Sequence, residues 1–92
     1  MQVRDKVAVV TGGASGIGAS IAHRFAAEGA RGVVVADINL ARAKAVAEAV
    51  GGLAVACDVS CQEDIQALVA AARERYGQVD VYVSNAGILG RP

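Results

Sequence analysis

Residues 6–18 read Lys-Val-Ala-Val-Val-Thr-Gly-Gly-Ala-Ser-Gly-Ile-Gly, and this stretch decides how the chain folds. Its first part, Val7–Thr11, is a short run of apolar and β-favouring residues, typical of a strand buried in a parallel sheet. Glycines follow at positions 12, 13, 16 and 18, and apolar residues at helical spacing come after them. The free amides and the positive dipole at the start of a helix attract anions, so the pattern predicts a phosphate-binding turn.

The spacing Thr11-Gly12-x-x-x-Gly16-x-Gly18 differs from the common Gly-x-Gly-x-x-Gly fingerprint and from a P-loop, which needs Gly-Lys-Ser/Thr. It resembles the cofactor-binding turn of the short-chain dehydrogenase/reductase family. The resemblance implies a set of cofactor-binding residues in the turn: Thr11, Gly12, Ser15, Gly16, Ile17 and Gly18. The alternative is a glycine-rich turn that binds nothing, but the glycines at this strand–helix junction would then weaken the fold without a reason.

Strand and helix patterns alternate along the chain without a linker, which predicts βαβ units and one parallel sheet. We expect a three-layer, doubly wound, Rossmann-like α/β domain over residues 1–92, truncated after its fourth strand. The expected strands are 7–11, 32–36, 53–57 and 79–84, and the expected helices are about 16–28, 40–50 and 60–76. Asn39 is the expected N-cap of the second helix, and Ser60 with Glu63 forms an expected capping box at the start of the third.

The residues after the strands matter most, because ligands of doubly wound sheets bind beyond the carboxyl ends of the strands. Asp37 follows the second strand, where an acid accepts hydrogen bonds from both ribose hydroxyls of adenosine and repels a 2′-phosphate. Asp37 therefore predicts NAD rather than NADP as the cofactor. The alternative is that Asp37 caps a helix or stands in a solvated loop.

Two further segments follow the third and fourth strands. The resemblance implies that Asp58 holds the adenine amino group and that Val59 packs on the adenine ring, with a helix-capping role for Asp58 as the alternative. The segment Asn85-Ala86-Gly87 resembles the family's Asn-Asn-Ala-Gly motif, which in the family stabilises the central sheet and lines the cofactor ribose. Ser84 replaces the first Asn of that motif, and a simple turn is the alternative.

The resemblance covers the whole chain but not the catalytic part of the family, whose members continue with strands that carry a Ser and a Tyr-x-x-x-Lys pair. The tyrosines here, Tyr76 and Tyr82, are followed four residues later by Asp80 and Ala86. We therefore expect no catalytic residues and no activity of this chain alone. The resemblance implies the NAD-binding half of an oxidoreductase that transfers hydride between NAD and an alcohol or ketone.

Two other functions fit parts of the pattern. One is a non-catalytic nucleotide-binding module, in which this chain would itself be the functional unit. The other is a methyltransferase that uses S-adenosylmethionine, since that fold also places glycines after the first strand and acids after the second and third. The spacing of the glycines and the Asn-Ala-Gly turn argue against the methyltransferase.

The composition excludes several other classes of protein. Nine basic and nine acidic residues give no net charge, and no basic cluster indicates a nucleic-acid partner. No apolar run reaches about 18 residues, so we expect no membrane span. No apolar signal region precedes the first strand, so we expect a cytoplasmic protein.

The remaining polar candidates indicate no metal site. Cys57 and Cys61 are expected to be reduced thiols, because a Cys-x-x-x-Cys pair supplies only two of the four ligands that zinc usually takes. The single histidine, His23, is expected to be a surface or packing residue of the first helix. The edge of the fourth strand is expected to lie open, and open edges pair with other chains, so we expect self-association through it.

Overall fold

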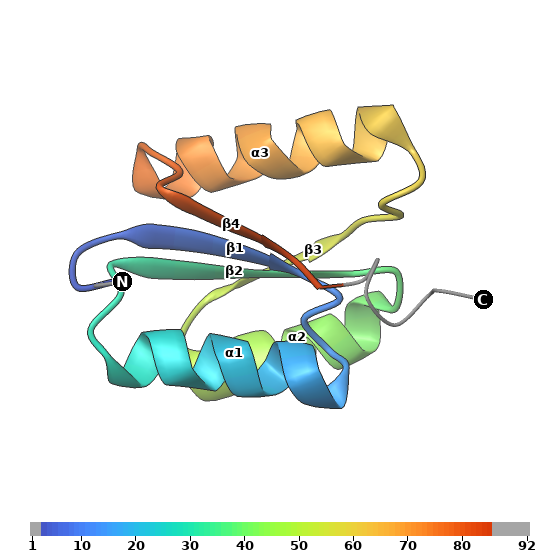
Figure 1. The fold of residues 1–92 in the computed structure, drawn as a ribbon. Helices are drawn as coiled ribbons and strands as arrows, with labels where there is room; N and C mark the ends of the chain where they lie inside the picture. The colour runs from blue at the N-terminus through green and yellow to red at the C-terminus, as the bar shows by residue number, and fades with distance from the viewer. Residues whose placement is uncertain (1–2, 86–92) are drawn as a thin grey trace.

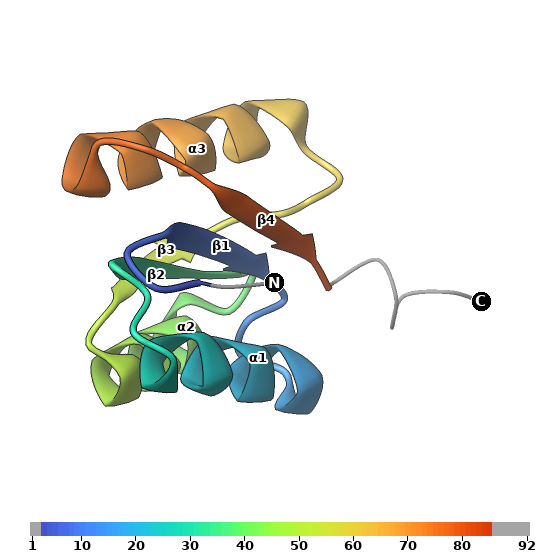
Figure 2. The same cartoon turned by 60° about the vertical axis from the view of Figure 1, so that its left-hand side comes forward.

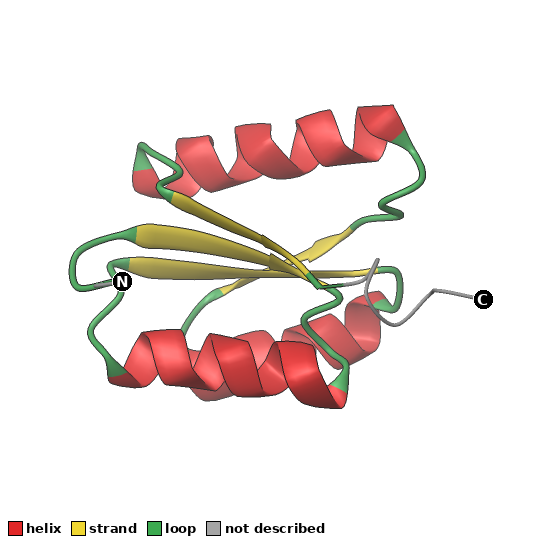
Figure 3. Ribbon diagram, viewed as in Figure 1, coloured by secondary structure: helices red, strands yellow, loops and turns green. Residues whose placement is uncertain are grey.

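The computed structural model describes residues 3–85, which form a three-layer α/β fold (Figure 1). In chain order the elements are β1 (Val7–Thr11), α1 (Gly16–Ala27), β2 (Gly32–Asp37), α2 (Leu40–Val50), β3 (Leu53–Ala56), α3 (Gln62–Tyr76) and β4 (Val81–Ser84). All strand pairs are parallel, and the strand order is β3-β2-β1-β4. Helices α1 and α2 cover one face of the sheet and α3 covers the other, which confirms the predicted doubly wound fold (Figure 3).

The core lies on both faces of the two central strands, which explains why β1 and most of β2 are fully buried. Residues of one strand alternate between the two faces, so Val34 joins the cluster under α3 and Val35 joins the cluster under α1 and α2. Apart from Leu68 of α3, the buried residues that the helices contribute at the contact are small ones, such as Ala22, Ala43, Ala47 and Ala72. The chain therefore packs its helices close to the sheet with very few aromatic residues.

The first two helices match their predicted starts and ends closely. The side chain of Asn39 accepts a hydrogen bond from the backbone N–H of Arg42 at 3.1 Å, which confirms Asn39 as the N-cap of α2. The C-terminal ends of α1, α2 and α3 are each followed by a glycine with positive φ: Gly29, Gly51 and Gly77. These glycines stop the helices because they adopt the left-handed conformation without a steric penalty.

The predicted capping box at the start of the third helix is wrong. Cys61 is the N-cap residue of α3 and makes no side-chain capping hydrogen bond, so the helix begins later than predicted. The side chain of Ser60 instead donates to Oδ1 of Asp58 at 2.7 Å, which holds Ser60 in the turn before the helix. Strand β3 correspondingly ends at Ala56, one residue before the predicted end at Cys57.

Strand β4 begins at Val81 rather than at the predicted position 79, because Asp80 makes side-chain contacts at that end of the sheet. Oδ2 of Asp80 accepts a hydrogen bond from the backbone N–H of Val7 at 2.8 Å, and the backbone N–H of Asp80 donates to the carbonyl oxygen of Val7 at 2.9 Å. Gln78 donates its side-chain amide to the same carboxylate oxygen at 2.6 Å. The carboxylate of Asp80 therefore ties the start of β4 to the start of β1.

This contact predicts that stability depends on pH through Asp80. The hydrogen bond from Val7, followed by that from Gln78, lowers the pKa of Asp80 below its ordinary value. A lowered folded-state pKa stabilises the folded chain above the unfolded-state value of about 3.9. This contribution is lost as pH falls through the folded-state pKa. We expect Asp80→Asn to melt at a lower temperature than wild type at pH 7, with the difference shrinking below about pH 4.

Thermal melts followed by circular dichroism between pH 7 and pH 3 measure this difference. Glu48→Gln is the control, because Glu48 is an exposed carboxylate on α2. A gap between wild type and Asp80→Asn that stays constant over this pH range would contradict the assignment to the carboxylate.

Within residues 3–85 the structure contains no helix with the length and apolar character needed to cross a bilayer.

Candidate functional site

The glycine turn after β1 is fixed by its own serine. The hydroxyl of Ser15, the N-cap residue of α1, accepts a hydrogen bond from the backbone N–H of Gly18 at 3.1 Å and donates to the carbonyl oxygen of Gly12 at 2.8 Å. Gly12 has a φ of 65°, a left-handed conformation that suits glycine. The turn therefore folds back on the start of α1, in the strand–turn–helix arrangement predicted for residues 7–28.

The glycines of the turn serve two different purposes. A Cβ at Gly18 would lie 2.1 Å from the carbonyl oxygen of Gly12, so the close contact between turn and helix requires glycine there. A Cβ at Gly16 would meet no atom within 4 Å apart from those of the adjoining residues and of its own helix turn, and Gly16 is exposed at the first position of α1. The fold does not need glycine at position 16, so this position leaves the helix start open to an approaching molecule. Ile17, the next residue, is also exposed, at 50%.

Asn85 joins the end of β4 to this turn. Its side-chain amide donates to the carbonyl oxygen of Gly12 at 3.2 Å and to the hydroxyl of Ser15 at 3.0 Å. Its backbone N–H donates to the hydroxyl of Thr11 at 3.2 Å, and that hydroxyl donates to the carbonyl oxygen of Val83 at 3.2 Å. Asn85 and Thr11 are both fully buried, so the ends of β1 and β4 form one hydrogen-bonded unit. Ala86 and Gly87, the other predicted residues of this motif, lie outside the described residues.

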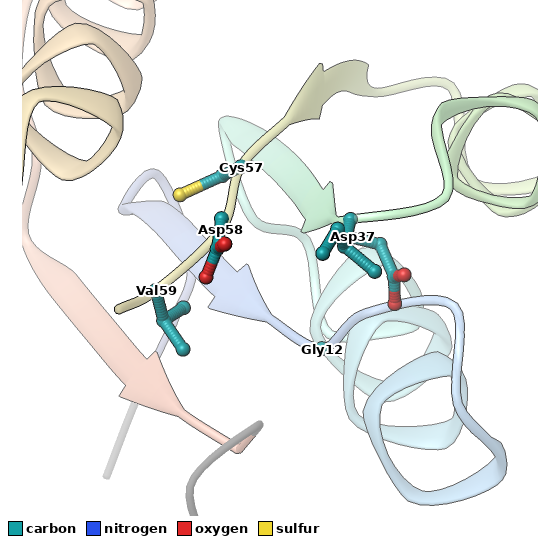
Figure 4. Close-up of a pocket in the computed structure, with 6 residues that line it drawn as sticks. Gly12, Asp37, Cys57, Asp58 and Val59 are labelled. Carbon is teal, nitrogen blue, oxygen red and sulfur yellow. The ribbon is translucent and has the colours of Figure 1, made fainter. Parts of the chain in front are cut away.

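Asp37 lies at the end of β2 with its carboxylate directed at the glycine turn (Figure 4). Oδ2 accepts a hydrogen bond from the backbone N–H of Ala14 at 3.1 Å, and Oδ1 accepts one from the backbone N–H of Asn39 at 3.0 Å. Because Asn39 is the N-cap of α2, Asp37 does not take the helix-capping position that was its alternative role. The structure thus brings Asp37 and the glycine turn together.

A hollow of about 190 Å³ lies between the ends of the strands, as Figure 4 shows. Its lining combines predicted and unpredicted residues: Gly12, Asp37, Ile38, Cys57, Asp58 and Val59. Ile38 and Cys57 were not predicted as site residues, although each directly follows a strand end and that position was the available signal. Ile38 is 74% exposed, which is unusual for so large an apolar side chain and places apolar surface at the rim of the hollow.

Asp58 both lines this hollow and supports the chain that follows it. Its Oδ1 accepts hydrogen bonds from the hydroxyl of Ser60 at 2.7 Å and from the backbone N–H of Ser60 at 2.9 Å. These hydrogen bonds lower the pKa of Asp58, the one from the hydroxyl having the larger effect, so Asp58 is ionised at neutral pH. Its neighbour Cys57 is buried, and burial is the main cause that raises the pKa of its thiol. The hollow therefore offers a carboxylate beside an uncharged thiol.

Neither tyrosine lines this hollow. The ring of Tyr76 packs on the backbone of β2, where a Cβ at Gly32 would lie 2.6 Å from it. Tyr82 lies on β4 and is 41% exposed, and desolvation is the main cause that raises its pKa. A raised pKa is the opposite of what a tyrosine needs to exchange protons near neutral pH. The side chains of residues 3–85 also form no cluster of three or more potential metal ligands.

Comparisons with known proteins agree with this geometry. A family model described as short chain dehydrogenase matches residues 6–92. An uncharacterised oxidoreductase of Mycobacterium bovis is 49% identical over 87 residues, which cover 90% of this chain and 35% of that protein. This chain thus spans about a third of the length of that curated relative.

Two solved structures are also similar. The 3-ketoacyl-(acyl-carrier-protein) reductase of Brucella melitensis, complexed with NADH, aligns with a TM-score of 0.83 and 44% identity over 87% of this chain and 34% of that chain. The hydroxysteroid dehydrogenase of Escherichia coli aligns with a TM-score of 0.88 and 37% identity over 94% of this chain and 37% of that chain.

Proposed function

The chain belongs to the short-chain dehydrogenase family, and we propose that it forms the NAD-binding part of an oxidoreductase that transfers hydride between NAD and an alcohol or ketone. The observation that carries the proposal is the open start of α1, where a Cβ at Gly16 would meet no atom within 4 Å. Glycine without a structural need fits a position where a phosphate approaches the backbone. The related reductase of Brucella melitensis was solved with NADH, which supports the choice of ligand.

The residues of the site fit the parts of a dinucleotide. The turn from Gly12 to Gly18 would hold the pyrophosphate, and Asp37 would accept hydrogen bonds from the adenosine ribose. Asp58 and Val59 would contact the adenine from the far side of the hollow. Asn85, Ala86 and Gly87 would line the ribose at the other end of the cofactor. Bound NAD would supply the hydride acceptor, and this chain would bind and orient it.

We do not expect this chain to turn over an alcohol by itself. Neither Tyr76 nor Tyr82 is followed after four residues by a lysine, and neither lines the hollow. A hydride transfer from an alcohol also needs a group that takes the hydroxyl proton. A non-catalytic nucleotide-binding module stays the alternative, whereas the family match disfavours the methyltransferase. A cytoplasmic location stays a prediction from the sequence.

We predict that the chain prefers NADH to NADPH by at least about tenfold in affinity. The carboxylate of Asp37 would repel a 2′-phosphate, and a difference of about 1.4 kcal/mol suffices for a factor of ten. Titrations of the 92-residue chain with each reduced cofactor, followed by nicotinamide fluorescence, measure the two affinities. Equal affinities would contradict the assignment of Asp37, and the absence of binding by either cofactor would contradict a role of this chain alone as a binding module.

We also propose that the chain associates with a second copy of itself through β4. Strand β4 lies at one edge of the sheet, opposite to β3 (Figure 2), and no strand within residues 3–85 pairs with its outer edge. Unpaired edges of parallel sheets accept further strands. Beside it, an apolar hollow lies between α1 and β4, lined by Ser20, Ile21, Arg24, Phe25 and Val83. A second copy that paired with the edge would cover this apolar surface as well.

We expect Tyr82→Lys to weaken this association by at least about tenfold, because a lysine on an edge strand opposes pairing. Sedimentation velocity at increasing protein concentration measures the effect. Gln66→Lys, an exposed position on α3, adds the same charge away from the edge and serves as the control. A wild-type chain that stays monomeric at all concentrations tested would contradict the proposal.

A further inference from the structure

Asp37 makes a contact that ribose binding does not require. Its Oδ2 accepts a hydrogen bond from the backbone N–H of Ala14 at 3.1 Å, although the two residues are 23 positions apart in the sequence. Its other oxygen, Oδ1, accepts from the backbone N–H of Asn39 at 3.0 Å. We propose that Asp37 is a positioning residue for the phosphate-binding turn, acting through Ala14, in addition to its proposed role as the ribose ligand. This inference rests on the proposed function.

The hydrogen bonds of the turn show why Ala14 depends on this side chain. The N–H of Gly13 donates to the carbonyl oxygen of Ala36 at 3.0 Å, and the N–H of Ser15 donates to the carbonyl oxygen of Gly12 at 3.1 Å. Of these three consecutive amides, only that of Ala14 is held by a side chain. Its acceptor is a carboxylate, and hydrogen bonds to charged acceptors are stronger than neutral ones.

The two roles can coexist at one carboxylate. An ionised carboxylate offers about four acceptor positions, so it can bind ribose hydroxyls while it still accepts from the amides of Ala14 and Asn39. Ribose recognition and the shape of the phosphate turn then depend on the same group. A substitution of Asp37 that only aimed to admit a 2′-phosphate would therefore also loosen the turn that binds the pyrophosphate.

Two variants, Asp37→Asn and Asp37→Ala, separate the positioning role from the charge of Asp37, because both remove that charge. Asp37→Asn keeps an oxygen that can accept from Ala14, whereas Asp37→Ala keeps none. The first readout needs no ligand and is the hydrogen exchange of the Ala14 amide, measured by NMR. We expect the exchange to be at least about tenfold faster in Asp37→Ala than in Asp37→Asn, with Val35 in β2 as the internal control. Equal exchange rates in both variants and in wild type would overturn the inference.

The second readout is binding of 2′,3′-dideoxy-ADP, which has the two phosphates but lacks the ribose hydroxyls that Asp37 would contact. We expect Asp37→Ala to bind it at least about threefold more weakly than Asp37→Asn. Equal affinities would mean that Asp37 acts on the ribose alone. If wild type binds neither ADP nor its dideoxy analogue, nucleotide binding by this chain alone fails, and the exchange of the Ala14 amide still decides whether Asp37 positions the turn.

Discussion

Replacing Gly18 by alanine is expected to lower the melting temperature of this chain by roughly 12–24 °C. An added Cβ would lie 2.1 Å from the carbonyl oxygen of Gly12 and 2.8 Å from the Cα atom of Gly13. All of these contacts are to backbone atoms, which cannot rotate away as a side chain would. Overpacking of this kind destabilises folded proteins by about 3 kcal/mol or more at its upper end.

The effect would spread beyond one contact. Moving the turn away from α1 also breaks the hydrogen bond from the N–H of Gly18 to Ser15 and disturbs the amide of Asn85, which donates to Gly12 and Ser15. Circular dichroism melts of wild type and Gly18→Ala measure the loss. Ser20→Ala is the matched control, since Ser20 is exposed on the same helix. A Gly18→Ala chain that melts like wild type would show that the turn packs differently from this description.

The sequence predicted the fold well where local chemistry and long-range packing agree. The valines of β1 and β2 are buried on both faces, and such strands read as continuous apolar runs. The ends of α2 were predictable because Asn39 and Gly51 act on the backbone within one helical turn. The position of Asp37 followed from the strand that precedes it, and no contact across the molecule was needed to place it.

The prediction failed where polar side chains compete for the same backbone groups. Ser60 and Glu63 have the spacing of a capping box, but Asp58 stands two residues before Ser60 and accepts both its N–H and its hydroxyl. Oδ2 of Asp64 accepts from the N–H of Asp58 at 3.0 Å, which further fixes this turn. A spacing rule cannot rank such competing acceptors, because their order depends on the path of the chain between β3 and α3.

The contacts of Asp80 and Asp37 were missed for a different reason. The carboxylate of Asp80 accepts a hydrogen bond from the N–H of Val7, and that of Asp37 accepts one from the N–H of Ala14. Both hydrogen bonds therefore depend on which strands lie side by side. The strand order β3-β2-β1-β4 brings these partners together, and the sequence pattern alone gave no register. Ile38 and Cys57 line the hollow for the same reason, because the ends of neighbouring strands are aligned there.

Gly16→Ala is the second substitution with a large expected effect, and it should act on binding instead of stability. Beyond the adjoining residues and the backbone of its own helix turn, the new Cβ would meet no atom within 4 Å, and φ at this position lies outside the left-handed region. Alanine also favours a helix more than glycine does, so the free energy of unfolding should stay the same or rise by up to about 1 kcal/mol. The same Cβ would stand over the open start of α1, where the proposed pyrophosphate would have to reach the backbone.

We therefore expect Gly16→Ala to weaken NADH binding at least about tenfold while the chain stays fully folded. Nicotinamide fluorescence measures this affinity. Where the binding is weak, changes in the NMR chemical shifts of the turn amides measure it instead. Paired with Gly18→Ala, this variant separates the two uses of glycine in one turn, since Gly18 is needed for packing and Gly16 is proposed to admit the ligand. An unchanged NADH affinity in Gly16→Ala would remove the main support for a pyrophosphate at this helix start, because the fold itself gives position 16 no reason to be glycine.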